Sequence, residues 1–192
     1  MRLAPLAPDN RARVSELLIA TAAFSPAEVA VALELFDETF GGTRRPERSD
    51  RRDDGRPGKS VATEGPALAF PDYEFVGAFD ERGQLLGYAC FGPTPATEGT
   101  YDLYWLAVDP AAQGQGAGYA LTSWVTNEIG KRGARLLLVE TSSRQEYAGA
   151  RTFYARSGYT EVARVRDFYA PADDRILLTI RLTAQEHGAA TQ

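Results

Sequence analysis

The stretch VDPAAQGQGAGYAL, Val108–Leu121, joins the end of an apolar segment to the start of a helical pattern through alternating glycines. Gly114, Gly116 and Gly118 allow close approach to another molecule, because a residue without Cβ leaves its N–H unscreened. A helix start adds N–H groups without intrahelical partners and the positive end of the helix dipole. The stretch therefore predicts either an anion-binding loop or a purely structural turn, and its neighbours must decide.

Length and charge suit one acidic globular domain. The chain has 192 residues and a net charge of −5, and we expect residues 1–192 to form a single domain. Residues 43–59 carry a local charge of +3, which leaves −8 on the remainder. This balance favours cationic small molecules over nucleic acid as partners. Residues 43–66 have almost nothing apolar and are predicted to be a mobile Arg-rich insertion, and residues 184–192 a disordered tail.

Cysteine and histidine are too scarce for several kinds of chemistry. Cys90 and His187 are the only residues of their types. An intramolecular disulfide, a Cys/His zinc site and a Ser-His-Asp triad are therefore not expected, and no metal is predicted. Cys90 lies in an apolar segment, which predicts a buried packing role. Without an apolar signal segment or a membrane-length apolar run, we expect a cytoplasmic protein that does not bind membranes.

Hydrophobic periodicity predicts an alternation of strands and helices. A helix follows Asp9 or Asn10, and a second begins at a capping box formed by Ser25 and Glu28. Counting residues 1–5 as a short strand, the predicted order is β–α–α–β–β–β–α–β–α–β–β. The other predicted strands are residues 73–79, 84–92, 100–108, 134–142, 160–169 and 175–182, and the later helices follow the glycine stretch and span 147–159.

Two nucleotide-binding motifs have partial matches in the sequence, one of them in the glycine stretch. A dinucleotide fold needs G-x-G-x-x-G, but here the spacing is G-x-G-x-G with Tyr119 at the third glycine position. Pro57–Ser60, PGKS, resembles the end of a P-loop, but Asp53 stands where that motif requires glycine. The sequence therefore argues against both motifs.

The glycine stretch and a later segment resemble one known family. Val108–Gly118, VDPAAQGQGAG, resembles the acyl-CoA pyrophosphate loop of the GNAT superfamily of N-acyltransferases, V-x-P-x-x-[RQ]-G-x-G-[IAV]-G. Ala150–Tyr159, ARTFYARSGY, is similar to its second signature, A-x-x-F-Y-x-x-x-G-[FY]. Three further segments resemble a bacterial GNAT subgroup whose acceptor is unassigned: Gly92–Pro110, Val139–Ser143 and Asp167–Asp174. The resemblance implies an α/β fold, a twisted mixed sheet of six to seven strands with helices on both faces.

The resemblance also implies acetyl-CoA as co-substrate. The pantetheine arm would lie along the strand that ends at Val108, and the pyrophosphate would meet the amides that follow it. One departure is Tyr147, which stands where the family frequently has asparagine. The implied cofactor contacts are Leu106, Ala107, Val108, Gln113, Gly114, Gln115, Gly116, Ala117, Gly118, Tyr147 and Tyr154.

Acyl transfer to an amine needs two proton transfers. By resemblance, Tyr154 protonates the departing sulfur; the alternative is aromatic packing. Asp102 precedes Val108 by six residues on one strand, where some family members carry a catalytic carboxylate, and is the candidate base. It would face the acceptor cleft if the strand alternates regularly, whereas a bulge would reverse the side. A solvated carboxylate is the alternative for Asp102, and Glu98, Glu140 or a water chain are weaker candidates for the base.

These features predict acetyl transfer from acetyl-CoA to a primary amine by direct attack in a ternary complex, by a monomer or homodimer. A non-catalytic acyl-CoA sensor or regulatory module and a nucleotide-binding protein are the alternatives. Acidic residues are expected in the loops near the acceptor site, and they suggest that the acceptor is a cationic small molecule. The alternative is that they are ordinary solvated charges. They are Glu98, Asp102, Asp167, Asp173 and Asp174.

Overall fold

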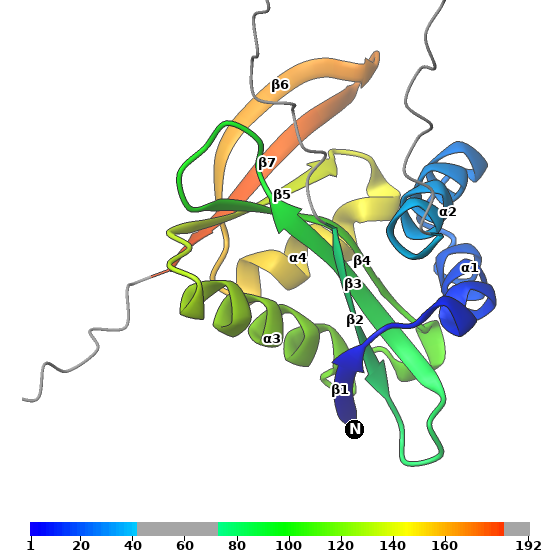
Figure 1. Cartoon of the computed structure of the whole chain (residues 1–192). Helices are drawn as coiled ribbons and strands as arrows, with labels where there is room; N and C mark the ends of the chain where they lie inside the picture. Colours follow the sequence, from blue (N-terminus) through cyan, green and yellow to red (C-terminus); the bar gives the residue numbers. More distant parts are fainter. Residues whose placement is uncertain (42–72, 183–192) are drawn as a thin grey trace, which may run out of the picture.

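Seven strands form one mixed sheet in the order β1-β2-β3-β4-β5-β7-β6 (Figure 1). All neighbours are antiparallel except β4 and β5, which are parallel. The computed structural model describes residues 1–41 and 73–182, so the predicted insertion at 43–66 and tail at 184–192 lie outside the described residues. The strands are β1 Arg2–Pro5, β2 Glu74–Phe79, β3 Leu85–Pro93, β4 Thr100–Val108, β5 Leu136–Ser142, β6 Thr160–Ala170 and β7 Asp173–Arg181.

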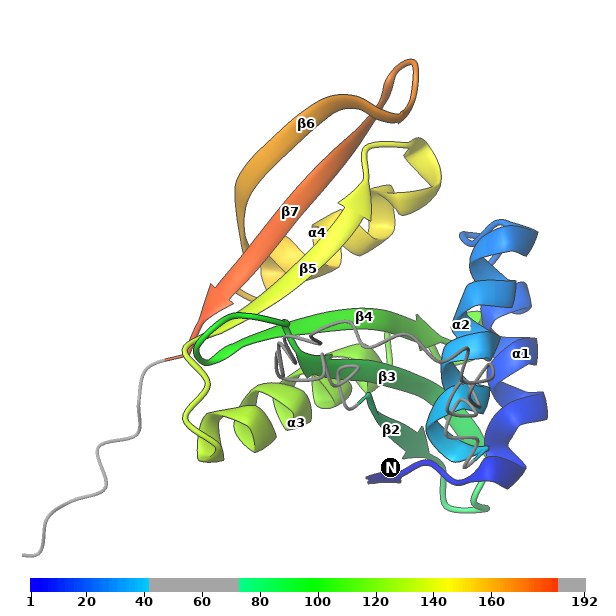
Figure 2. The same ribbon diagram turned by 45° about the horizontal axis from the view of Figure 1, so that its top comes forward.

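Helices cover both faces of the sheet, as predicted. The helices α1 (Arg11–Ala20) and α2 (Pro26–Phe40) pack over β2 to β4 on one face, and α3 (Ala117–Lys131) and α4 (Ala148–Arg156) lie on the other (Figures 1 and 2). Each face has its own core of buried apolar side chains. None of the helices within residues 1–41 and 73–182 is long and apolar enough to cross a membrane. The predicted fold class and element order are confirmed.

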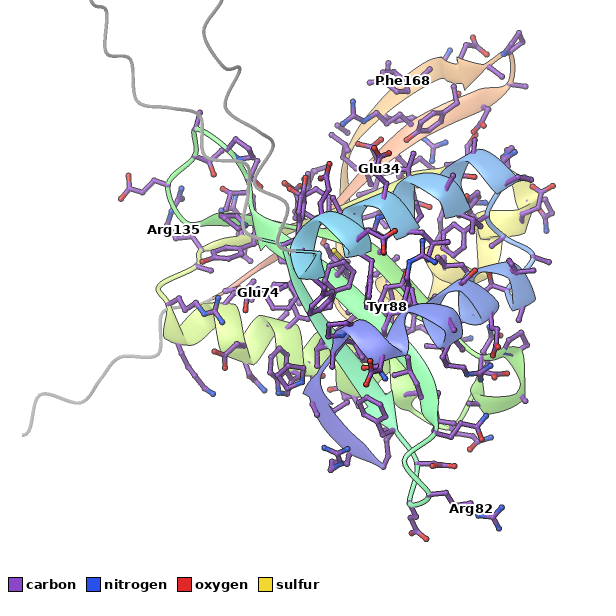
Figure 3. The ribbon with its side chains drawn as sticks, turned by 45° about the vertical axis from the view of Figure 1, so that its right-hand side comes forward. Glu34, Glu74, Arg82, Tyr88, Arg135 and Phe168 are labelled. Carbon is purple, nitrogen blue, oxygen red and sulfur yellow. The ribbon has the colours of Figure 1, made fainter. Side chains whose placement is uncertain are left out.

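The core beneath α1 and α2 contains Cys90 and Tyr88 on β3, and Figure 3 labels the tyrosine. Cys90 is fully buried, and burial raises the pKa of its thiol. A thiol held protonated in an apolar core is a poor nucleophile. The predicted packing role of Cys90 is confirmed.

The predicted capping box at the start of α2 is present. The hydroxyl oxygen of Ser25 accepts a hydrogen bond from the Glu28 N–H at 3.3 Å, and Glu28 Oε2 accepts one from the Ser25 N–H at 2.7 Å. The helix α1 begins directly after Asn10, as predicted, but the Asn10 side chain does not cap it. Instead Asn10 Oδ1 accepts from the Ala7 N–H at 2.8 Å, at the start of a short 3₁₀ helix before α1. Both devices supply partners for backbone groups at helix ends.

A gap opens in the sheet between β4 and β5. The two strands pair from Thr100 with Leu136 to Leu103 with Val139 and then separate, although β4 continues to Val108. Figure 2 shows the strands diverging from a common end, with α1 and α2 at the open side. Within the described residues, the edge of β4 facing this gap has no partner strand beyond Leu103. Its backbone groups are therefore available to an extended ligand.

A bulge in β4 changes which way its side chains point. Cys90 pairs with Trp105 and Phe91 with Leu103, so Tyr104 has no opposite residue on β3. The side chains of Tyr104 and Trp105 both pack toward α1 and α2, and the alternation resumes out of phase after them. Consequently Asp102 and Val108 lie on opposite faces, which is the reversal expected of a bulge.

Candidate active site

A cavity of about 580 Å³ lies beside the end of β4 that no longer pairs with β5. Its walls come from the connector between α1 and α2, the end of β4 with the glycine loop, and the start of α4. Among the predicted site residues, those lining it are Leu106, Ala107, Val108, Gln113, Gly114, Gly116, Ala117, Gly118, Tyr147 and Tyr154. Gln115 and Asp102 are not among its lining residues.

The glycine loop holds its backbone in a conformation that favours glycine. Gly114 and Gly116 have φ angles of +76° and +86°, and no heavy atom lies within 4 Å of a Cβ added to either. The glycines are therefore needed for backbone geometry and leave open space beside the loop. Asp109 stabilises the loop, since its Oδ1 accepts from the Ala111 N–H at 2.9 Å and its other oxygen pairs with Arg13 of α1.

The first turn of α3 offers free hydrogen-bond donors to the cavity. Gly116 is its N-cap and has no side chain with which to accept from the helix. The N–H groups of Gly118 and Tyr119 have no acceptor in the part of the chain that the structure describes. The side chains of Gln113 and Gln115 instead donate to the Val108 and Ala111 carbonyls within the loop. An anionic group such as a phosphate fits this set of backbone donors at a helix N-terminus.

Tyr154 reaches the same cavity from α4. Its ring packs edge-on against Phe153 and Tyr159, each at a centroid distance of 5.2 Å. Burial, followed by the neighbouring Tyr159, raises the pKa of Tyr154, so the hydroxyl stays protonated at neutral pH. Within residues 1–41 and 73–182 this hydroxyl makes no hydrogen bond. It can therefore donate to a group bound in the cavity.

Tyr147 contacts a helix that is distant in the sequence. Its ring lines the cavity, but its hydroxyl donates to Glu28 Oε1 on α2 at 2.7 Å. Burial and the Glu28 carboxylate raise the pKa of Tyr147. Sequence reasoning missed Thr21, Ala23 and Phe24, which line the cavity from the α1–α2 connector. The capping box marked Glu28 only as a helix start, and no local pattern indicates its contact with Tyr147.

Asp102 lies at the closed end of the gap, on the sheet face opposite Tyr154. It pairs with Leu138, one step before the last β4–β5 pair. Its carboxylate accepts from the Thr94 hydroxyl at 2.6 Å and the Tyr104 hydroxyl at 3.4 Å. Burial and then the charge of Asp102 raise the pKa of Tyr104, so Tyr104 remains a donor. Asp102 and Tyr154 thus approach the gap from different faces.

Like Asp102, the two weaker base candidates do not line the cavity. Glu140 pairs with Arg175 and accepts a hydrogen bond from the Tyr169 hydroxyl. Glu98 lies between β3 and β4, and its backbone carbonyl accepts hydrogen bonds from the Arg135 side chain, which Figure 3 labels. Neither is placed to remove a proton inside the cavity.

Most of the acidic residues expected around the acceptor stabilise local structure. Asp173 is buried and lies 3.5 Å from Arg144, and Asp174 pairs with Arg164 at 3.1 Å. Asp167 Oδ1 accepts from a backbone N–H within the β6–β7 turn at 2.6 Å. Arginine neutralises the first two, so they contribute little attraction for a cation.

Comparison with known sequences identifies the family. Residues 71–161 match the family described as Acetyltransferase (GNAT) domain. The chain is also 32% identical over 117 residues to the ribosomal protein bS18-alanine N-acetyltransferase of Escherichia coli strain K12, which covers 57% of this chain and 78% of that protein. The chain belongs to the GNAT acetyltransferases. The family predicted from the glycine loop is confirmed.

Solved structures of GNAT proteins share the fold. A protein from Desulfovibrio desulfuricans assigned to the GNAT family is 34% identical, with a TM-score of 0.74 over 95% of this chain and 99% of that chain. An aminoglycoside 6′-N-acetyltransferase, solved with coenzyme A, is 15% identical with a TM-score of 0.64, over 95% of this chain and 98% of that chain. At this lower identity the likeness is one of fold alone.

Proposed function

We propose that this GNAT protein transfers the acetyl group of acetyl-CoA to a primary amine by direct attack in a ternary complex. One observation carries the proposal: one cavity joins the donor-rich glycine loop to the side chain of Tyr154, whose ring is buried and whose hydroxyl has no hydrogen-bond partner in the described residues. A site for the anionic end of a thioester carrier and a proton donor for its sulfur are thus available in one space.

Acetyl-CoA would bind along the walls of the β4–β5 gap. Its pyrophosphate accepts hydrogen bonds from the amides between Gln113 and Gly118, and its pantetheine arm pairs with the free edge of β4 at Leu106, Ala107 and Val108. Tyr147 and Tyr154 flank the arm from the side of α4. The coenzyme A complex of the aminoglycoside 6′-N-acetyltransferase, which shares this fold, supports the choice of co-substrate.

The two candidate catalytic groups, Asp102 and Tyr154, lie on opposite faces of the sheet. This arrangement suits attack by the amine from one face and departure of the sulfur on the other. The amine nitrogen attacks the thioester carbonyl carbon from the sheet face of Asp102. Because Asp102 does not line the cavity, a chain of water molecules would carry the proton from the amine to its carboxylate. The carbon–sulfur bond breaks, and Tyr154 donates its hydroxyl proton to the sulfur on the opposite face. The products are the N-acetylated amine and coenzyme A thiol, and both residues recover their starting protonation through solvent.

The acceptor would be a cationic small molecule with a primary amine. The Tyr73 ring packs edge-on against Tyr104 at a centroid distance of 5.1 Å, and the Tyr104 hydroxyl donates to Asp102. Burial raises the pKa of Tyr73, and the negative charges of Glu38 and Asp102 add to this rise. Neither carboxylate has a salt-bridge partner within the described ranges 1–41 and 73–182. Their uncompensated charge attracts an ammonium group toward the face from which attack is proposed.

The test is thiol release from acetyl-CoA in the presence of matched cationic and neutral primary amines. We expect release with amines and faster release with cationic ones. Binding of acetyl-CoA without turnover of any amine would favour an acyl-CoA-binding module, and absence of binding would reject the proposal. Equal rates for cationic and neutral amines would contradict the proposed preference for a cationic acceptor but not the proposed acetyl transfer.

A further inference from the structure

Two segments far apart in the sequence form facing walls of the cavity. The connector between α1 and α2 contributes Thr21, Ala23 and Phe24, and the start of α4 contributes Tyr147. The connector is strained, because Ala22 has a φ angle of +53°, in the left-handed region that disfavours alanine. A short strained connector needs contacts elsewhere to stay in position.

A hydrogen bond joins these two walls. The Tyr147 hydroxyl donates to Glu28 Oε1 at 2.7 Å, and Glu28 Oε2 accepts from the Ser25 N–H at 2.7 Å. One carboxylate therefore links the end of the connector to the start of α4. Because this acceptor is charged and partly buried, the bond belongs to the stronger class of hydrogen bonds.

Aromatic contacts continue the link toward β4. The Phe24 ring meets Trp105 edge-on at a centroid distance of 5.4 Å and Tyr147 at 6.3 Å. The Arg144 guanidinium lies over the Tyr147 ring, 5.4 Å from its centre. Tyr147 therefore contacts both the connector and Arg144, and its hydroxyl donates to Glu28 of α2.

We propose that the Tyr147–Glu28 hydrogen bond holds the α1–α2 connector in place across the cavity and thereby sets the width available to the thioester arm. Tyr147 is then a positioning residue, which acts through the connector. This inference rests on the proposed acetyl-CoA site. Without this hydrogen bond, backbone entropy and the strain at Ala22 favour a connector displaced from the cavity.

Tyr147→Phe keeps the aromatic ring and removes only the hydroxyl. We expect amide hydrogen exchange at residues 21–25 of the free chain to become about tenfold faster, because a charge-assisted hydrogen bond is lost. The Kd for acetyl-CoA should rise by up to the same factor, since only the closed population binds tightly. KM for acetyl-CoA should follow, with kcat changed by less than about twofold.

Two further variants test whether the effect belongs to this bond. Glu28→Gln should reproduce part of the change, and combining it with Tyr147→Phe should add almost nothing, because both remove one interaction. Tyr169→Phe is the matched control. It also removes a tyrosine-to-carboxylate hydrogen bond, to Glu140, but in a part of the sheet that does not line the cavity. It should leave exchange at residues 21–25 and acetyl-CoA affinity unchanged.

Unchanged amide exchange at residues 21–25 in Tyr147→Phe would overturn the proposal that this hydrogen bond holds the connector in place. Faster exchange with unaltered acetyl-CoA affinity would overturn its role in setting the cavity width. The exchange measurement uses the free chain, so it is independent of the proposed function. If the wild-type chain bound no acetyl-CoA, the proposed function would fail, while faster exchange in the variant would still support the link between the two walls.

Discussion

Replacing Gly116 by alanine should damage both the fold and the binding of coenzyme A, by separable amounts. The φ angle of Gly116 is +86°, a conformation that costs an L residue about 1–2 kcal/mol. Alanine also restricts the unfolded chain, which returns about 0.4–1 kcal/mol. No atom lies within 4 Å of the added Cβ, so no steric cost is expected. The net loss is about 1 kcal/mol, or a fall in Tm of about 2–4 °C.

Gly83→Ala provides a matched control. Gly83 has a φ angle of +80° and no atom within 4 Å of an added Cβ, but it lies in the turn between β2 and β3. Both variants should therefore lose similar stability. Gly116→Ala alone should weaken coenzyme A binding, by about 10- to 100-fold, because the backbone adjustment misdirects N–H groups that donate to the pyrophosphate.

Denaturant unfolding measures the stability of both variants, and calorimetric titration measures their affinity for coenzyme A. The reasoning would be refuted if Gly116→Ala bound coenzyme A as tightly as Gly83→Ala despite an equal loss of stability. An equally large loss of binding in Gly83→Ala would also refute it, since the effect would then come from general destabilisation.

Three further predictions concern the catalytic groups and the loop anchor. Tyr154→Phe should lower kcat by about 10²- to 10⁴-fold in steady-state assays and leave coenzyme A binding intact; an unchanged rate would remove its acid role. Asp102→Asn should lower kcat most at the pH values where the amine is protonated, and an unchanged pH profile of kcat would argue against Asp102 as the general base. The Ala111 N–H and then Arg13 lower the pKa of Asp109, so its stabilisation is present above the ordinary aspartate pKa and is lost as the pH falls through the lower folded value. Asp109→Asn should therefore be less stable than wild type at pH 7 by about 0.5–1 kcal/mol in urea unfolding, and a difference that persisted at about pH 2 would contradict this.

Local chemistry explains the parts of the fold that were predictable. The β4 strand occupies the predicted residues 100–108, and α2 begins at the predicted capping box. Turn, cap and periodicity signals depend on neighbouring residues, so a single sequence carries them. Eight of the ten predicted cofactor contacts that line the cavity lie between Leu106 and Gly118, and the other two, Tyr147 and Tyr154, lie beside or within the second family signature. This closeness in sequence explains why they were found together.

The roles predicted for the acidic side chains could not be judged from the sequence, because they depend on how strands and side chains pack. Asp102 is on the face opposite Val108 owing to one extra residue in β4, and strand alternation from the sequence cannot count a bulge in advance. Asp173 and Asp174 have arginine partners, one of them ten residues away on another strand. Which charges remain unpaired is settled only when the strands pair.

By itself, the sequence determined the family, the order of strands and helices and the position of the glycine loop before a helix, because each depends on patterns among residues within a few positions of one another. The tertiary structure alone decided the gap between β4 and β5, the face of Asp102 and the bond between Tyr147 and Glu28. These last two residues are 119 positions apart, and only the packing of α2 against the start of α4 brings them into contact.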